Sequence, residues 1–217
     1  MEISWYGHSC FRLTERGLAT VVADPFDSKA VGYSPLRLKA DIVTLSHDAP
    51  GHNNADAVKG TSHVIRGPGE FEIGSVFITG VQTDGAGTGK KNRDQLRNTL
   101  YVFDYEGMTV AHLGDLRQVP SQTEVEALGT VNIALVPVGG GGGLNASKAA
   151  EVVSLLEPNI VVPMHYATPE GKIALDSLGK FLKEMGLGKQ ESQPTLKVSR
   201  AGLPEETRVV VLDYQRE

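Results

Sequence analysis

The feature that most constrains this chain is an apolar run, Ile42–Leu45, that leads directly into a loop carrying His47 and His52. Two later apolar runs end in a similar way, one shortly before Asp115 and the other on His165. Ligands of layered α/β proteins gather beyond the carboxyl ends of strands, because the loops there can turn side chains from several strands into one cleft. We therefore predict that these four residues form one site, where a metal ion could bind.

Composition limits the classes of protein to which the chain could belong. Its 217 residues, 40% of them hydrophobic, are enough to bury one full core, so we expect a single domain over residues 1–217. The net charge of −5 disfavours a nucleic-acid binder, and the cationic cluster at residues 90–97 is interpreted as part of a solvated loop. The single cysteine, Cys10, cannot form an internal disulfide, so we expect a protein of the reducing cytoplasm. Without a signal sequence or a long apolar stretch, we expect no membrane contact.

The first half of the sequence predicts β-strands separated by glycines. Tyr105, Glu106 and Gly107 between two of them are typical of a hairpin turn, whereas residues 84–98 lack apolar periodicity and predict a surface loop. The expected strands cover residues 3–6, 10–13, 20–23, 42–45, 64–66, 71–73, 76–79, 100–104 and 108–112.

The second half alternates helices and strands. Ser121 and Glu124 have the spacing of a capping box for a helix that ends near Gly129, and Asn145 could cap a second helix that Pro158 closes. A third helix is expected over residues 172–185, and strands are expected at residues 133–137, 160–163, 196–198 and 209–212. The mixture predicts two sheets flanked by helices, an α/β (α+β) architecture.

Three other residues could assist the site. His8 is expected to donate a hydrogen bond to a metal ligand, and His112 is expected to face the opposite side of its strand from the metal. Asp48, which follows His47, could supply a substitute carboxylate. These residues are therefore predicted as auxiliary rather than as ligands.

A glycine run, residues 139–143, follows the strand at 133–137 and precedes a helix. Gly139, Gly140 and Gly141 could present backbone N–H groups to an anion, so a phosphorylated substrate could dock there. The run lacks the Gly-Lys-Ser/Thr of a nucleotide-binding loop. The alternative interpretation is a flexible rim of the cleft.

Several short motifs occur in an order that spans nearly the whole chain. They are Trp5-Tyr-Gly-His8, Ala23-Asp-Pro25, the strand entering His47 to His52, Gly67-Pro-Gly-Glu70, Gly114-Asp115, Leu135-Val-Pro-Val-Gly-Gly and Pro163-Met-His165-Tyr. Their order resembles the metallo-β-lactamase-fold superfamily, and most closely its small metal-dependent hydrolases related to ascorbate-6-phosphate lactonase. The resemblance implies a four-layer αββα sandwich with a metal cleft along one edge.

The resemblance also implies seven protein ligands for two metal ions. The chain keeps four of them: His47, His52, Asp115 and His165. The loop motif His-x-His-x-Asp-His has Ala49 and Gly51 at its two middle ligand positions, and a histidine usual near residues 82–84 is absent. Each ion needs about three protein ligands, so we expect one ion or none. Zinc is expected first, with iron or manganese as alternatives.

Two functions from different classes remain open. In the first, the chain is a mononuclear metal hydrolase that cleaves an ester, lactone or phosphoester of a small molecule, with Asp115 and His52 as catalytic residues. In the second, it is a metal-poor relative that acts as a binding or regulatory module. A purely structural role also remains, in which Asp115 stabilises a turn and His165 bonds a backbone carbonyl. A homo-oligomer is possible, although no interface is identifiable in the sequence.

Overall fold

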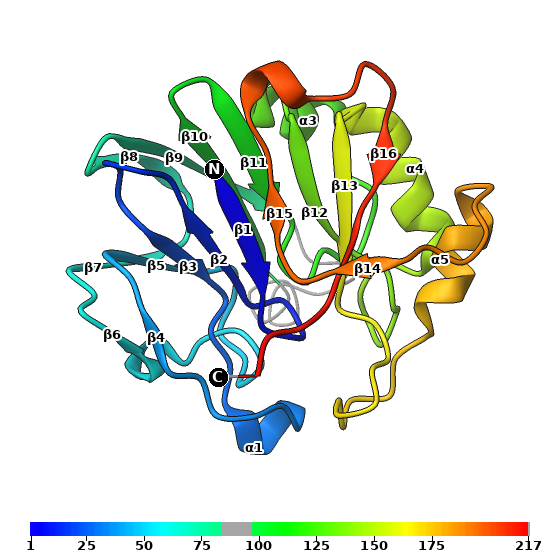
Figure 1. Cartoon of the computed structure of the whole chain (residues 1–217), viewed down its shortest axis with the longest axis horizontal. Helices are drawn as coiled ribbons and strands as arrows, with labels where there is room; N and C mark the ends of the chain where they lie inside the picture. The colour runs from blue at the N-terminus through cyan, green and yellow to red at the C-terminus, as the bar shows by residue number, and fades with distance from the viewer. Residues whose placement is uncertain (84–96, 217) are drawn as a thin grey trace.

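Two β-sheets face each other in the structure, a computed structural model that describes residues 1–83 and 97–216 (Figure 1). The first sheet contains β1 (Glu2–Trp5), β2 (Phe11–Thr14), β3 (Val21–Ala23), β5 (Ile42–Leu45), β7 (His63–Arg66) and β15 (Leu196–Lys197). Its spatial order is β15-β1-β2-β3-β5-β7, and β3, β5 and β7 run parallel. A late strand, β15, thus closes the sheet beside the first strand of the chain.

The second sheet has seven strands. They are β8 (Gly69–Ile73), β9 (Val76–Thr83), β10 (Asn98–Tyr105), β11 (Met108–His112), β12 (Ile133–Pro137), β13 (Ile160–Met164) and β16 (Arg208–Val209), in the spatial order β16-β13-β12-β11-β10-β9-β8. The predicted hairpin between β10 and β11 is confirmed: Glu106 and Gly107 form its two-residue turn with φ of 54° and 85°. From β11 to β16 the strands are parallel.

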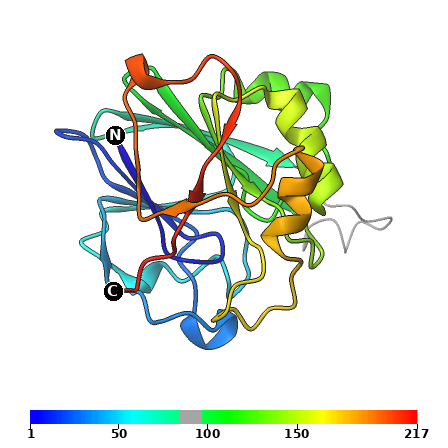
Figure 2. The same ribbon diagram turned by 45° about the vertical axis from the view of Figure 1, so that its right-hand side comes forward.

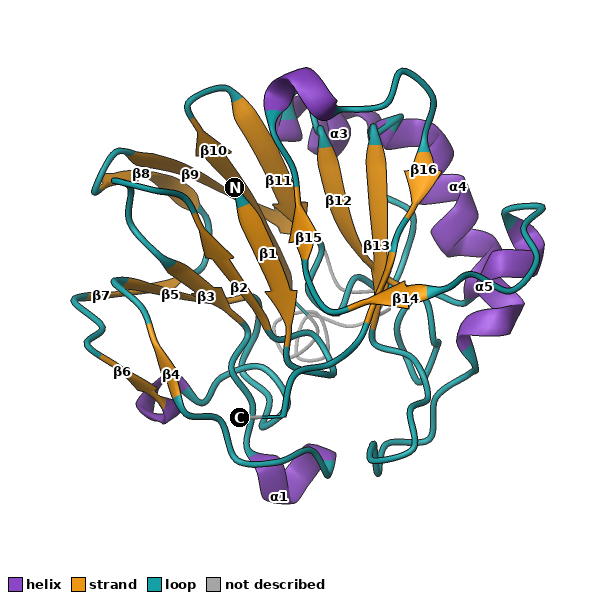
Figure 3. Ribbon diagram, viewed as in Figure 1, coloured by secondary structure: helices purple, strands orange, loops and turns teal. Residues whose placement is uncertain are grey.

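Helices cover the outer face of the second sheet (Figures 2 and 3). They are α3 (Gln122–Leu128), α4 (Ala146–Leu156) and α5 (Leu178–Glu184). Both predicted caps are confirmed, because Ser121 accepts from the backbone N–H of Glu124 and Asn145 accepts from that of Lys148. Among the described residues, no helix has the length and apolar character needed to cross a bilayer.

The outer face of the first sheet carries a thinner layer. It is built from α1 (Ser28–Val31), the 3₁₀ turn η1 (Ala55–Ala57) and the paired strands β4 (Leu38–Lys39) and β6 (Val58–Lys59). The remaining elements are η2 (Arg200–Gly202) and the pair β14 (Ser192–Gln193) and β17 (Val211–Leu212). The layers follow the αββα order that the sequence predicted, with one helical layer reduced to a single short helix.

Alternating side chains explain why the central strands are largely apolar, with Thr44 of β5 as a buried polar exception. In β3, Val21 and Ala23 point into the core between the sheets, while Val22 packs in the outer layer around α1. In β5, Ile42 faces the inner core and Val43 the outer layer. Side chains of a strand alternate between its two faces, so a sheet covered on both sides favours apolar residues at successive positions.

One predicted helix is half wrong and one predicted loop is largely outside the described residues. The segment before Leu178 is irregular, because the backbone N–H of Lys172 donates to the carbonyl of Val31 and that of Asp176 to the carbonyl of Gly139. Those tertiary hydrogen bonds replace the helical ones. Of the loop predicted at residues 84–98, only 97 and 98 are described, and Asn98 is a buried residue of β10.

Tyr101 links the two sheets. This fully buried residue of β10 places its hydroxyl 3.1 Å from the carbonyl oxygen of Leu45 and 3.2 Å from that of Gly67. Tyr101→Phe should lower the free energy of unfolding by about 1–2 kcal/mol, because buried carbonyls lose a donor. Urea denaturation measures the change. The control is Tyr214→Phe, whose half-buried hydroxyl accepts from exposed Arg216 and should matter by less than about 0.5 kcal/mol. Equal changes in both variants would contradict this role.

Candidate metal centre

The carboxyl ends of strands from both sheets meet at one edge of the sandwich. β1, β3 and β5 end there in the first sheet, and β11 and β13 end there in the second. Backbone hydrogen bonds cross between the sheets near this edge: His165 N–H donates to the carbonyl of His8 at 3.0 Å, and Thr99 N–H donates to that of Ser46 at 2.8 Å. Loops far apart in sequence therefore deliver their side chains to the same place.

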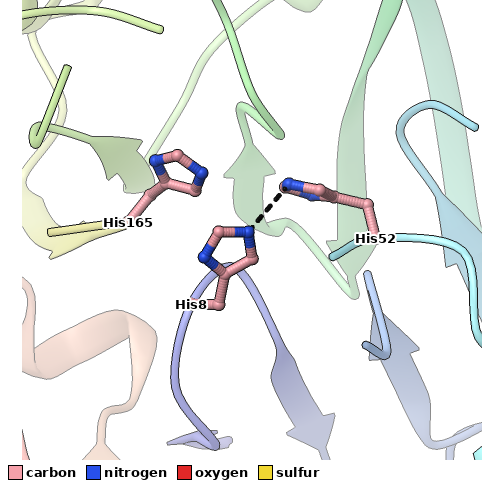
Figure 4. A group of neighbouring side chains, drawn as sticks. All are labelled: His8, His52 and His165. Carbon is pink, nitrogen blue, oxygen red and sulfur yellow. Dashed lines mark hydrogen bonds between the residues drawn. The ribbon is translucent and has the colours of Figure 1, made fainter. Parts of the chain in front are cut away.

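Three buried histidines converge at this edge, one from each of the loops after β1, β5 and β13 (Figure 4). His8, His52 and His165 each offer a ring nitrogen, and these three atoms all lie within 4.8 Å of one another. His8 Nε2 and His52 Nε2 are 3.1 Å apart. Two nitrogen ligands of a tetrahedral zinc ion lie roughly 3.3 Å apart, so this pair already has close to the required spacing.

Asp24 fixes the orientation of His52. Its carboxylate is fully buried and accepts from His52 Nδ1 at 2.7 Å, from the Ser46 hydroxyl at 2.5 Å and from the Ser46 backbone N–H at 2.7 Å. Burial alone would raise the pKa of Asp24, but His112 and His52, with the hydrogen bonds from His52 and Ser46, bring it to about 2. Because Nδ1 carries the proton, Nε2 of His52 presents its lone pair to the centre of the cluster.

The imidazoles of His8, His165 and the neighbouring His47 are held in the neutral form. Burial, and next the neighbouring His52, lowers the pKa of His165 to about 3 and that of His47 to about 4. Burial, followed by His165 and His52, keeps the pKa of His8 well below its usual value. A neutral imidazole has a free lone pair, which is the form that binds a metal ion.

Asp115 faces the same centre from the second sheet. Its Oδ1 lies 3.9 Å from His165 Nε2, and its Oδ2 accepts from Arg117 Nη2 at 2.9 Å. Asp115 Oδ1 and His165 Nδ1 are buried and have no hydrogen-bond partner in the described part of the chain. Buried polar atoms without partners are rare and point to a bound ion or water. Together with the imidazole spacing, these unpaired atoms show that the residues fit a metal ion.

Gly51 makes room for His8. A Cβ atom at position 51 would lie 2.7 Å from His8 Nε2 and 3.1 Å from its Cδ2. The ring of His8 therefore occupies the space that a longer side chain at position 51 would need. His8, which the sequence suggested only as an auxiliary residue, stands here as one of the three converging imidazoles.

The structure places His47 and Asp48 outside the group of three histidines. The His47 ring lies 4.2 Å from that of His52, centre to centre, and its Nδ1 is 3.1 Å from the Ser46 hydroxyl. Asp48 is exposed, and its Oδ1 accepts from Asn53 Nδ2 at 2.6 Å. His47 is thus a neighbour of the centre, whereas Asp48 faces solvent.

His112 is used within the fold. Its Nε2 donates to the carbonyl of Ser9 at 2.8 Å, and its Nδ1 accepts from the backbone N–H of Gly114 at 3.2 Å. Both ring nitrogens are occupied, and burial lowers the pKa of this residue. His112 therefore supports the loops that carry the site and has no nitrogen left for a ligand.

The glycine run packs against the site. A Cβ at Gly143 would lie 2.7 Å from Asp115 Oδ1, and one at Gly139 would lie 2.3 Å from the carbonyl oxygen of His165. The N–H of Gly140 donates to the carbonyl of Leu144. Close approach explains the glycines at 139 and 143, and anion binding at Gly139, Gly140 and Gly141 stays a prediction.

Backbone strain is concentrated at this edge. Six non-glycine residues among those described have positive φ, and three of them belong to the site: His8 (50°), Asp24 (46°) and His165 (52°). This left-handed region is disfavoured for side chains other than glycine, and it is typical of residues whose position serves function.

Comparison with known proteins identifies the family. Residues 2–165, more than half of the chain, match the beta-lactamase superfamily domain. The chain belongs to the beta-lactamase superfamily. A UPF0173 protein from Pyrococcus furiosus is 30% identical, in an alignment that covers 77% of this chain and 84% of the relative. A UPF0173 metal-dependent hydrolase from Thermoplasma acidophilum is 27% identical, with the same two coverages of 77% and 84%.

A solved structure is similar to this chain over nearly its whole length. A Thermotoga maritima protein assigned to the Zn-dependent hydrolases of the metallo-β-lactamase superfamily is 36% identical, with a TM-score of 0.78 over 97% of both chains. This confirms the family and the sandwich fold that the sequence motifs indicated. Asp24 was part of one such motif, yet its role as the hydrogen-bond partner of His52 was missed. Its place directly after β3, at the same sheet edge as His47, was the available signal.

Gly51→Ala tests the placement of His8 without replacing any proposed ligand residue. The added methyl group should displace the His8 ring and weaken zinc binding by about tenfold or more, as losses around a metal site do. Zinc affinity measured by competition with a chromophoric chelator checks this. Gly188→Ala is the matched control, since a Cβ there meets nothing within 4 Å and it should bind zinc as the wild type does. Unchanged affinity in both variants would remove His8 from the site.

Proposed function

We propose that the chain is a metal-dependent hydrolase that holds one ion between His8, His52 and His165. The observation that carries the proposal is the convergence of three buried imidazoles, two of whose nitrogens are 3.1 Å apart. The Thermoplasma relative bears the name metal-dependent hydrolase, which supports the same class for this chain. The superfamily match supports it as well.

A single ion accounts best for the available ligands. The side chains of Ala49 and Gly51 have no donor atoms, and Asp48 is exposed and accepts a hydrogen bond from Asn53. Within residues 1–83 and 97–216, the three histidines are the one group of three or more His, Cys, Asp or Glu side chains with ligand spacing. A second ion would lack the roughly three protein ligands it needs.

Zinc suits this donor set best. Imidazole nitrogen is a preferred zinc ligand, and three imidazoles with one open position are typical of catalytic zinc sites. Iron and manganese are the alternatives, because imidazole with a nearby carboxylate also accepts them. The burial of all three histidines keeps bulk water from competing for the ligand nitrogens.

The chain's own residues define what the site can do. A bound ion would lower the pKa of a water molecule toward about 7 and polarise an ester, lactone or phosphoester oxygen. Asp115 Oδ1, which is buried and has no hydrogen-bond partner among the described residues, would accept a proton from that water. Arg117 holds the other carboxylate oxygen, and Asp24 holds His52, so both side chains are kept in position before substrate binds.

Metal content tests the proposal directly. Protein purified without chelator should contain about one metal ion per chain, because three ligands define one site. His8→Ala, His52→Ala and His165→Ala should each lose it in elemental analysis. His63→Ala is the control, because His63 is exposed at the start of β7 and should retain the metal. Wild-type protein that stays metal-free and refuses zinc, iron and manganese at micromolar concentration would overturn the proposal and favour a binding or regulatory module.

Asp115→Asn separates proton transfer from metal binding. Asparagine keeps the shape of the side chain but cannot accept a proton, so metal content should stay near the wild-type value. Hydrolysis of a panel of aryl esters, lactones and phosphoesters should fall by about 100- to 10,000-fold, the range typical of a lost general base. A variant that keeps its metal and hydrolyses these substrates at the wild-type rate would exclude Asp115 from the chemistry.

A further inference from the structure

A cavity of about 320 Å³ lies directly beside the candidate metal centre. Its walls come from the ends of β5, β7, β9 and β10, and they include His47, Asp48, Arg66 and Arg97. The His47 ring, which lines the cavity, is 4.2 Å from that of His52, centre to centre. The volume suits a small molecule rather than a polymer.

The cavity is positively charged in a protein that is negatively charged as a whole. Two guanidinium groups, Arg66 and Arg97, line it, although the net charge of the chain is −5. In the described part of the chain, no carboxylate forms an ion pair with Arg66. The one acidic residue on the wall, Asp48, accepts a hydrogen bond from Asn53 at 2.6 Å. The residues that line the cavity thus carry two formal positive charges, on Arg66 and Arg97, and one negative charge, on Asp48.

Guanidinium groups recognise carboxylates and phosphates through paired, charge-assisted hydrogen bonds. Arg66 is the last residue of β7, and β7 pairs in parallel with β5, whose end leads to His47. A substrate could therefore place its reacting group against the histidine cluster while an anionic group further along the molecule lies between the arginines.

We propose that this cavity is the subsite for an anionic group, a carboxylate or a phosphate, on the substrate of the neighbouring centre. The inference rests on the proposed hydrolase function and adds the class of substrate to it. Arg66 and Arg97 bind the anion, and neither is one of the three proposed metal ligands, so anion binding can be measured in protein without the metal. This role differs from the solvated loop to which the sequence assigned Arg97.

Anion binding to the full-length protein after metal removal by chelation and dialysis tests the subsite apart from the metal. Calorimetric titrations with inorganic phosphate and with succinate should show saturable binding by wild-type protein. Arg66→Gln and Arg97→Gln should each weaken it by roughly tenfold or more, because a charge-assisted contact is lost. Arg37→Gln, an exposed arginine outside the cavity, is the control and should bind as the wild type does. Loss confined to phosphate would assign a phosphate, and loss confined to succinate a carboxylate.

Failure of this inference is distinguishable from failure of the hydrolase proposal. The subsite proposal would be overturned if wild-type protein showed no saturable binding of either anion up to about 100 mM, a concentration well above the Kd of even weak specific binding. That outcome would count against the subsite even if the metal centre proved active. Equal affinity in Arg66→Gln and wild type would overturn it too. In the metal-loaded protein, the same variants should raise KM for an anionic substrate roughly tenfold with kcat unchanged, the signature of lost ground-state binding.

Discussion

The buried carboxylate of Asp24 is the constraint on which the site depends. A charged group without solvent exposure is stable only when hydrogen bonds and neighbouring charges compensate its lost hydration. Asp24 obtains that compensation from Ser46, the first residue of the loop after β5, and from His52, which lies further along the same loop. The same contacts that make the charge tolerable therefore hold the loop against the end of β3 and aim His52. Folding of this edge and orientation of an imidazole are one event.

The site is shared between the two sheets. His8, Asp24 and His52 come from the first sheet, and Asp115 and His165 come from the second. The backbone hydrogen bond from His165 to His8 joins the two contributions, and Tyr101 bridges the sheets deeper in the sandwich. Neither sheet supplies all three imidazoles of the group. Correct packing of one sheet on the other is thus required before the three imidazoles can converge.

Local signals in the sequence were sufficient for much of the fold. The β10–β11 turn and the caps at Ser121 and Asn145 depend on a few neighbouring residues, so their patterns could be read directly. The predicted helix over residues 172–185 failed in its first half because backbone contacts to Val31 and Gly139, distant in sequence, replaced helical hydrogen bonds. Apolar periodicity contains no information about such partners.

The candidate site was predictable to a similar degree. Parallel strands end at the same edge of a sheet, so their direction predicts that His52, His165 and Asp115 lie near one another. The structure places them there. The position of His8 could not be inferred in this way. It depends on the absence of a side chain at Gly51, more than forty residues away, because the His8 ring fills the space that such a side chain would take. A contact of this kind is visible only in three dimensions.

The left-handed backbone of His8, Asp24 and His165 has a consequence for stability. Such conformations cost of the order of 1–3 kcal/mol each, and glycine or asparagine would adopt them more readily. Glycine at any of these positions would relax the backbone but remove a side chain that faces the site. Part of the folding free energy of this chain is therefore given up to hold two imidazoles and a carboxylate in place.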